Sequence, residues 1–298
     1  MGMGSMDVVP GVSGGTIAFI TGIYETLLES IKKVDLEALT LLRKFEIKAL
    51  WNHVNGNFLF PLLAGIGTSV LSLATVMVGL LETYPIQVWS FFFGLIIISA
   101  LIVLKSIKHW NIGVLFAIII GAVIAYLITS STPAETPEGA WFLFVAGAVA
   151  ICAMILPGIS GSFILLLFGK YEYVLSALKE FRIVDILIFA AGCLVGILSF
   201  SRLVSWLLKK YYQVTIGILA GFMLGSLYKV WPWKETLKTF VDRHGEVKPL
   251  IERNIFPDEY LAKTGHESFF LQAVLFAAGG LLLVFTIDRI AAMLNPEN

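Results

Sequence analysis

The chain has 298 residues, of which 58% are hydrophobic and only 14% charged, with zero net charge and a mean hydropathy of +0.87. Soluble domains carry about a quarter charged residues, so this composition predicts a multi-pass membrane protein. The balanced charge gives no basic face for nucleic acid. Both cysteines lie in apolar runs, and no two histidines have metal-ligand spacing. We therefore expect no nucleic-acid partner, no metal and no cofactor.

The first apolar region, residues 1–31, is interrupted by "DVVPGVSGGT" at residues 7–16. It lacks the basic segment of a cleavable signal peptide. Proline and glycine end a helix, and serine can cap the next one. Such a break is tolerated in lipid only where the freed backbone is buried in protein or lines a cavity. Residues 1–31 are therefore predicted to form a broken or re-entrant helix pair.

Further along the chain, a polar insert at 32–56 precedes three apolar runs, each about the length that spans a bilayer. They cover 58–81, 86–104 and 111–129. A second interrupted region, 140–178, contains "MILPGISGSF" and is again predicted to be a broken pair. Three more spanning helices are predicted at 185–208, 213–230 and 269–290, with a mixed-charge loop at 231–267.

Lysine and arginine between the apolar runs predict the orientation. They are frequent in 32–56 and 105–108 and recur at 209–210, whereas 130–140 has none. The positive-inside rule places the first three stretches in the cytoplasm and 130–140 outside. The same threading places the loop 231–267 outside, against its basic content.

The two broken phrases belong to an internal repeat. An offset of 147 residues aligns Pro10 with Pro157 and continues to the C-terminal side. The aligned pairs include Gly11/Gly158, Ser13/Ser160, Gly14/Gly161, Ile17/Ile164, Gly22/Gly169, Tyr24/Tyr171, Glu25/Glu172 and Leu28/Leu175. Later the offset becomes 127, which aligns Gly94 with Gly221 and Ser99 with Ser226.

This pattern predicts an all-α polytopic membrane protein made of two inverted repeats, 1–138 and 139–298. Each repeat holds a broken helix pair followed by three transmembrane helices. An odd number of crossings in the first repeat places the second upside down. Inverted repeats with broken helices are typical of transporters. The alternative is an old duplication in which the glycines are only structural.

A helix that restarts inside the membrane presents free N–H groups and the positive end of its dipole, which together favour an anion. The candidate phosphate-binding groups are Ser13, Gly14, Gly15 and Thr16 in the first phrase, and Ser160, Gly161 and Ser162 in the second. Alternatively, each serine only caps its own helix.

Several charged or hydroxyl-bearing residues are further candidates. Arg202 lies inside an apolar helix, where a charge is costly, and can bind phosphate bidentately or extend to the interface. Asp7, Glu25 and Glu172 are candidates for H⁺ or Na⁺ coupling or for helix capping. Tyr24, Tyr171 and Lys170 are candidate headgroup contacts.

Enzyme functions fit poorly. "GVSGG" at 11–15 matches G-x-S-x-G, but that motif needs a preceding strand and a histidine partner. No histidine lies in a predicted span. We therefore expect no catalytic residues.

The phrases "DVVPGVSGGTIAFITGIYETL" and "LPGISGSFILLLFGKYEYVL" closely resemble a bacterial and archaeal membrane family associated with polyprenyl-phosphate transport (PopT). The resemblance covers essentially the whole chain. One departure is that the family's apolar helix before the first phrase is reduced here to a few residues.

The resemblance implies a flippase that returns undecaprenyl phosphate, or a related polyprenyl phosphate, to the cytoplasmic leaflet for reuse in envelope synthesis. Two alternatives stay open from the residues alone. One is an ion-coupled transporter of a small soluble anion or cation. The other is a membrane protein that binds the lipid carrier without transporting it.

Overall fold

The computed structural model describes residues 2–7, 13–133, 136–241 and 247–294 and confirms a helical, multi-pass membrane protein. Within these residues, five helices are long and apolar enough to cross a bilayer, or six if one bent pair counts as a span. Pro10 and Gly11 of the first broken phrase lie outside the described residues.

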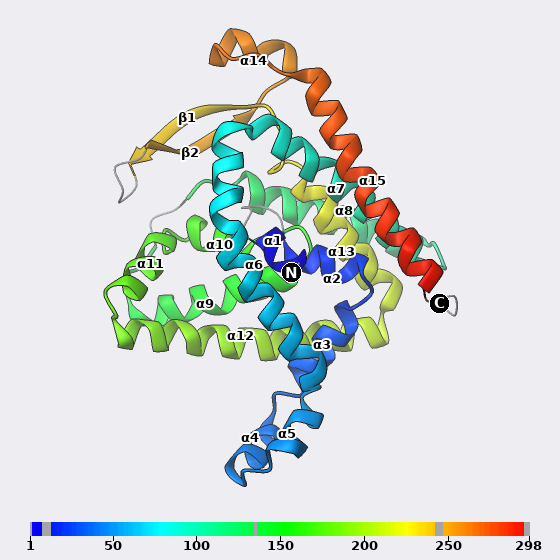
Figure 1. The fold of residues 1–298 in the computed structure, drawn as a ribbon, viewed down its shortest axis with the longest axis vertical. Helices are drawn as coiled ribbons and strands as arrows, with labels where there is room; N and C mark the ends of the chain where they lie inside the picture. The colour runs from blue at the N-terminus through cyan, green and yellow to red at the C-terminus, as the bar shows by residue number, and fades with distance from the viewer. Residues whose placement is uncertain (1, 8–12, 134–135, 242–246, 295–298) are drawn as a thin grey trace.

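The first half contains eight helices in its described residues: α1 (Gly2–Asp7), α2 (Gly14–Ile20), α3 (Tyr24–Lys32), α4 (Leu36–Arg43), α5 (Ile47–His53), α6 (Gly56–Thr83), α7 (Pro85–Lys105) and α8 (Ile112–Ser130). The three predicted spans correspond to α6, α7 and α8, each within about two residues of its predicted ends. The polar insert forms α4 and α5, which project from the body of the molecule (Figure 1).

The second half continues with α9 (Ala140–Ile155), α10 (Gly161–Leu167), α11 (Tyr171–Lys179), α12 (Ile183–Lys210), α13 (Tyr212–Ser226), β1 (Lys234–Val241), β2 (Val247–Asn254), α14 (Pro257–Thr264) and α15 (Phe270–Leu294). The α10–α11 pair is bent by 107°.

Two predictions in this half were wrong. The helix predicted at 213–230 ends at Ser226, because the Lys229 amide turns back onto the Ser226 carbonyl at 2.9 Å. The predicted loop 231–267 instead holds an antiparallel β-hairpin and α14. Figure 1 shows this hairpin at the opposite end of the molecule from α4 and α5.

The broken segments of the two halves have the same local geometry. Helices α2 and α10 each have seven residues, and α3 and α11 each have nine. The turns between them use Gly22 at φ +70° and Gly169 at φ +61°, a conformation that glycine adopts without steric cost. The long helices that follow, α6 and α12, both have 28 residues.

The two short helices α3 and α11 lie at opposite ends of α12. Lys209, near the end of α12, pairs with Glu29 of α3 at 2.5 Å. Asp185, in the first turn of α12, accepts a hydrogen bond from the Tyr173 hydroxyl of α11 at 2.9 Å. At a rise of 1.5 Å per residue, Asp185 and Lys209 are about 36 Å apart along the helix. On this basis we propose that the two halves are inverted copies.

Two pairs of long helices approach very closely, and they use corresponding positions of the repeat. A Cβ on Gly94 of α7 would lie 2.0 Å from the Ala277 carbonyl oxygen of α15. Its repeat partner, Gly221 of α13, would meet the Ile118 oxygen of α8 at 2.3 Å. Each pair therefore joins helices from different halves, and glycine allows the backbones to touch.

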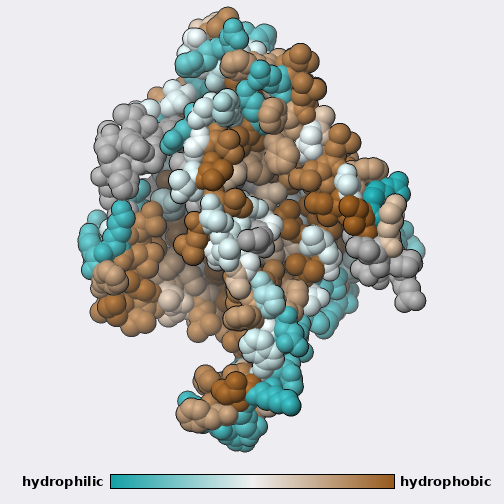
Figure 2. Space-filling model, viewed as in Figure 1, coloured by the Kyte–Doolittle hydropathy of each residue, from teal (hydrophilic) through white to brown (hydrophobic). Residues whose placement is uncertain are grey.

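The remaining surface of the long helices is apolar. Leu71 of α6 is 86% exposed and Leu271 of α15 is 73% exposed, as expected for side chains that face lipid. Figure 2 shows hydrophobic residues over much of the middle of this face, and hydrophilic residues gathered toward the α14 end.

The adjacent glycines of α15 provide a matched test of this packing. A Cβ on Gly280 would lie 2.1 Å from the Phe91 oxygen, whereas one on Gly279 would meet nothing within 4 Å. We expect Gly280→Ala to destabilise the protein by about 1–3 kcal/mol through overpacking. Gly279→Ala should be neutral or slightly stabilising. Thermal unfolding in detergent measures both, and equal melting temperatures would contradict the packing described here.

Candidate functional site

The start of α2 is fully capped. The Gly14 amide donates to Asp7 Oδ1 at 2.7 Å, and the Gly15 amide donates to Ser13 Oγ at 3.1 Å. The Thr16 amide donates to the Ser13 carbonyl at 3.0 Å. Ser13 is completely buried. The donors expected to bind phosphate in the first phrase are therefore occupied by the chain's own oxygens.

Ser13 also joins the two halves. Its hydroxyl donates to the Met154 carbonyl of α9 at 3.0 Å. A Cβ on Gly15 would lie 2.6 Å from the next carbonyl oxygen, that of Ile155. The start of α2 is therefore packed against the end of α9, where the second broken phrase begins.

The start of α10 is different. Ser160 is only 5% exposed, but its hydroxyl does not cap the helix and instead bonds the Ser162 hydroxyl at 2.7 Å. The amides of Gly161, Ser162 and Phe163 have no acceptor among the described residues. This helix start therefore offers two adjacent hydroxyls and three backbone donors.

The first half holds further buried hydroxyls near its short helices. Thr16 Oγ1 and the Tyr24 hydroxyl are buried and have no partner among the residues that the structure describes. Glu25, next to Tyr24, is exposed. In the second half, the equivalent Tyr171 and Glu172 are half-buried, and Glu172 makes an interaction of its own.

Lys170 is a buried cation. It is 7% exposed, and its Nζ lies 5.7 Å from the centre of the Phe142 ring and 5.9 Å from that of Tyr173. In the described part of the chain, Nζ has no ion pair or hydrogen bond. The cation–π contacts of such a lysine leave its N–H donors available.

Arg202 is exposed on α12 and has no ion pair or hydrogen bond to another described residue. The buried face of this helix instead carries Ser201, Val204, Ser205 and Leu208. The structure therefore does not bring Arg202 into contact with Ser13 or Ser160.

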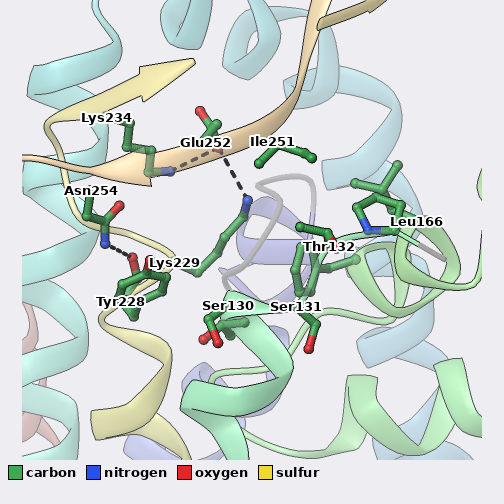
Figure 3. A pocket seen from close by; sticks show the side chains of 13 residues that line it. Ser130, Ser131, Thr132, Leu166, Tyr228, Lys229, Lys234, Ile251, Glu252 and Asn254 are labelled. Atoms are coloured by element: carbon green, nitrogen blue, oxygen red, sulfur yellow. Dashed lines mark hydrogen bonds and ion pairs between the residues drawn. The ribbon is translucent and has the colours of Figure 1, made fainter. Parts of the chain in front are cut away.

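Sequence reasoning missed a second polar site. A pocket between the hairpin, α10 and the end of α8 contains Lys229, Lys234 and Glu252 (Figure 3). These residues lie in or beside the segment predicted to be an irregular loop. The signal that could have located them is the alternation of charged residues in "KETLK" and "IERN".

Comparison with known proteins identifies the family. The family model named VCA0040-like, described as undecaprenyl phosphate translocase-like, matches residues 3–248. This chain belongs to that family. Over 291 residues it is 47% identical to a polyprenyl-phosphate transporter of Vibrio cholerae, covering 98% of this chain and 94% of the relative.

A polyprenyl-phosphate transporter of Staphylococcus aureus is 33% identical over 253 residues, which cover 77% of this chain and 83% of the relative. No solved structure matches the chain. Membership in this family, together with the apolar helices, makes the chain a multi-pass protein of the cytoplasmic membrane.

The two phrase serines should differ in their contribution to stability. Ser13→Ala removes a helix cap and leaves the Met154 carbonyl unpaired, so we expect a loss of about 1–3 kcal/mol. Ser160→Ala removes only the bond to Ser162, so its loss should be smaller, below about 1 kcal/mol. Unfolding free energies in mixed micelles measure both. A larger loss for Ser160→Ala would refute the capping assignment.

Proposed function

We propose that this protein is a flippase that returns undecaprenyl phosphate, or a related polyprenyl phosphate, to the cytoplasmic leaflet for reuse. The observation that carries this proposal is the near full-length identity of 47% to a protein named polyprenyl-phosphate transporter. The broken helices and the lipid-facing surface suit a substrate with a charged head and an apolar tail.

We place the phosphate at the start of α10. Ser160, Gly161 and Ser162 supply hydroxyl and amide donors there, and a phosphate needs several donors when it leaves water. Among the described residues, those amides have no competing acceptor. Lys170 follows α10 and can add a positive charge on the hairpin side of this site.

The start of α2 is the proposed coupling site. Asp7 holds the Gly14 amide at 2.7 Å, while its other oxygen, Oδ2, is buried and without a partner among the described residues. Protonation of Asp7 would weaken its hold on Gly14 and expose that amide and Thr16 to a phosphate. This is a route for H⁺ coupling. Na⁺ bound at the same carboxylate is the alternative.

The other candidates take more peripheral roles. Arg202 is exposed on α12, so we propose that it attracts the headgroup as the lipid approaches rather than holding it in the bound state. Glu25 and Glu172, with the adjacent Tyr24 and Tyr171, mark equivalent turns at opposite ends of α12. There they can relay protons or contact the headgroup.

A transport assay tests the α10 site. In proteoliposomes containing a fluorescent short-chain polyprenyl phosphate, the double variant Ser160→Ala, Ser162→Ala should flip lipid at least tenfold more slowly than wild type. Ser199→Ala is the matched control, because Ser199 is an exposed serine of α12 that bonds only to its own helix. Equal rates for the double variant and the control would exclude this headgroup site.

The same preparation separates the alternative functions. Uptake of a soluble ion without lipid movement would indicate the small-ion transporter. Binding of the polyprenyl phosphate without movement between leaflets would indicate a lipid-carrier-binding protein.

A further inference from the structure

The pocket beneath the hairpin is a small polar cavity of about 70 Å³. By the usual volume of a buried water, it has room for about five water molecules. Figure 3 shows Lys229, Lys234 and Glu252 on its hairpin side and Ser130, Ser131 and Thr132 opposite them. We call it the hairpin pocket.

The register of the hairpin aims the charged residues into this pocket. Lys234 of β1 pairs with Asn254 of β2, and Thr236 pairs with Glu252. Because side chains alternate along a strand, Lys234, Glu252 and Asn254 share one face. The intervening residues Glu235 and Arg253 pair with each other at 2.6 Å.

Hydrogen bonds hold the base of the hairpin in place. The Trp231 indole donates to the Ile255 carbonyl at 2.9 Å, and the Trp233 indole donates to that of Ser268 at 2.8 Å. The Asn254 amide donates to the Tyr228 carbonyl at 2.7 Å, next to Lys229. The pocket therefore has a fixed wall rather than a loose loop.

Two cations in the pocket share one carboxylate oxygen. Lys229 Nζ lies 3.4 Å and Lys234 Nζ 3.6 Å from Glu252 Oε2. Ammonium–carboxylate hydrogen bonds are usually about 2.7–2.9 Å long. The surface pair Lys263–Glu259 is 2.6 Å, although it has no need to compensate for burial. The lysines therefore hold Glu252 loosely and keep donors free.

The pKa values follow from this arrangement. Burial lowers the pKa of Lys234 to about 8, with Glu252 opposing the shift and Lys229 adding to it. Burial alone would raise the pKa of Glu252, but the two ammonium groups outweigh it and lower that pKa. Near neutral pH the pocket therefore carries one uncompensated positive charge.

The pocket also adjoins the proposed transport site. Phe163, in the first turn of α10, lines it together with Leu166. Lys229 Nζ lies 4.9 Å from the centre of the Phe163 ring. The free cationic donors are thus one side chain away from the start of α10.

We propose that the hairpin pocket binds a phosphate monoester between Lys229 and Lys234, and that this phosphate displaces the carboxylate of Glu252. A terminal phosphate has three oxygens, so it can bond both ammonium groups separately where the carboxylate shares one oxygen between them. Its charge of up to about −2 also compensates both cations. Resting on the proposed function, this is the headgroup of the polyprenyl phosphate on the hairpin side, which the sequence predicts to be outside.

Calorimetric titration of the full chain in detergent tests the pocket. The probe is a C10 prenyl monophosphate, and separate arms use inorganic phosphate and the corresponding alcohol. Lys229→Gln should weaken prenyl-phosphate binding at least tenfold. Lys238→Gln, which removes an exposed charge of the same hairpin, should leave it unchanged. Equal affinities for Lys229→Gln and wild type would overturn the proposal.

Glu252→Gln gives a result of opposite sign. Because the phosphate competes with this carboxylate, the variant should bind the prenyl monophosphate at least threefold more tightly than wild type. If Glu252 only holds the hairpin, the variant should melt at a lower temperature without any gain in affinity, and that result would overturn the proposal. Lysine-dependent binding of inorganic phosphate alone would identify free phosphate as the ligand and remove the link to the lipid.

Transport by the wild-type protein distinguishes the two levels of the argument. If wild type moves the lipid while the pocket variants bind as wild type does, the pocket fails and the proposed function stands. If wild type moves no lipid, the proposed function fails whatever the pocket binds.

Discussion

Two short helices begin inside the body of this membrane protein, and lipid offers no acceptor for the N–H groups of their first turns. At α2 the chain supplies these acceptors itself, through Ser13 and Asp7. At α10 it does not do so within the described residues. The two starts have the same length and backbone geometry, so the difference comes from side chains. The repeat position of Asp7 is occupied by Met154, which has no carboxylate. One substitution between the halves thus leaves one anion site closed and the other open.

A carboxylate occupies a potential anion site in two places. Asp7 accepts from the Gly14 amide at the start of α2, and Glu252 lies between two lysines in the hairpin pocket. Both arrangements compensate positive charge while no substrate is bound. Both also make binding a replacement of one anion by another, which costs less than filling a site whose donors lack any partner. Such a site can hold a phosphate without holding it so tightly that release becomes slow.

The sequence predicts what depends on local pattern and misses what depends on contacts between distant segments. Apolar runs located the long helices because a bilayer requires about 20 such residues. Proline and glycine located the breaks, and the positive φ of Gly22 and Gly169 shows why glycine stands there. The Ser13–Met154 bond joins residues 141 positions apart and has no local signature. The hairpin was missed because its strands alternate charged with other polar residues and lack an apolar face. Arg202 was recognised by the cost of its charge, but that cost does not tell which way the side chain points.

The packing of the long helices restricts where movement can occur. The pairs α7/α15 and α8/α13 touch through glycine, backbone against backbone, so neither pair can slide without a clash. The short helices have fewer such contacts, and each meets α12 at a different end, through Glu29–Lys209 on one side and Tyr173–Asp185 on the other. A single rigid helix therefore connects the two broken segments. A displacement of α12 that loosens one of these contacts must act on the other, which is the physical link that alternating access to opposite sides of a membrane requires.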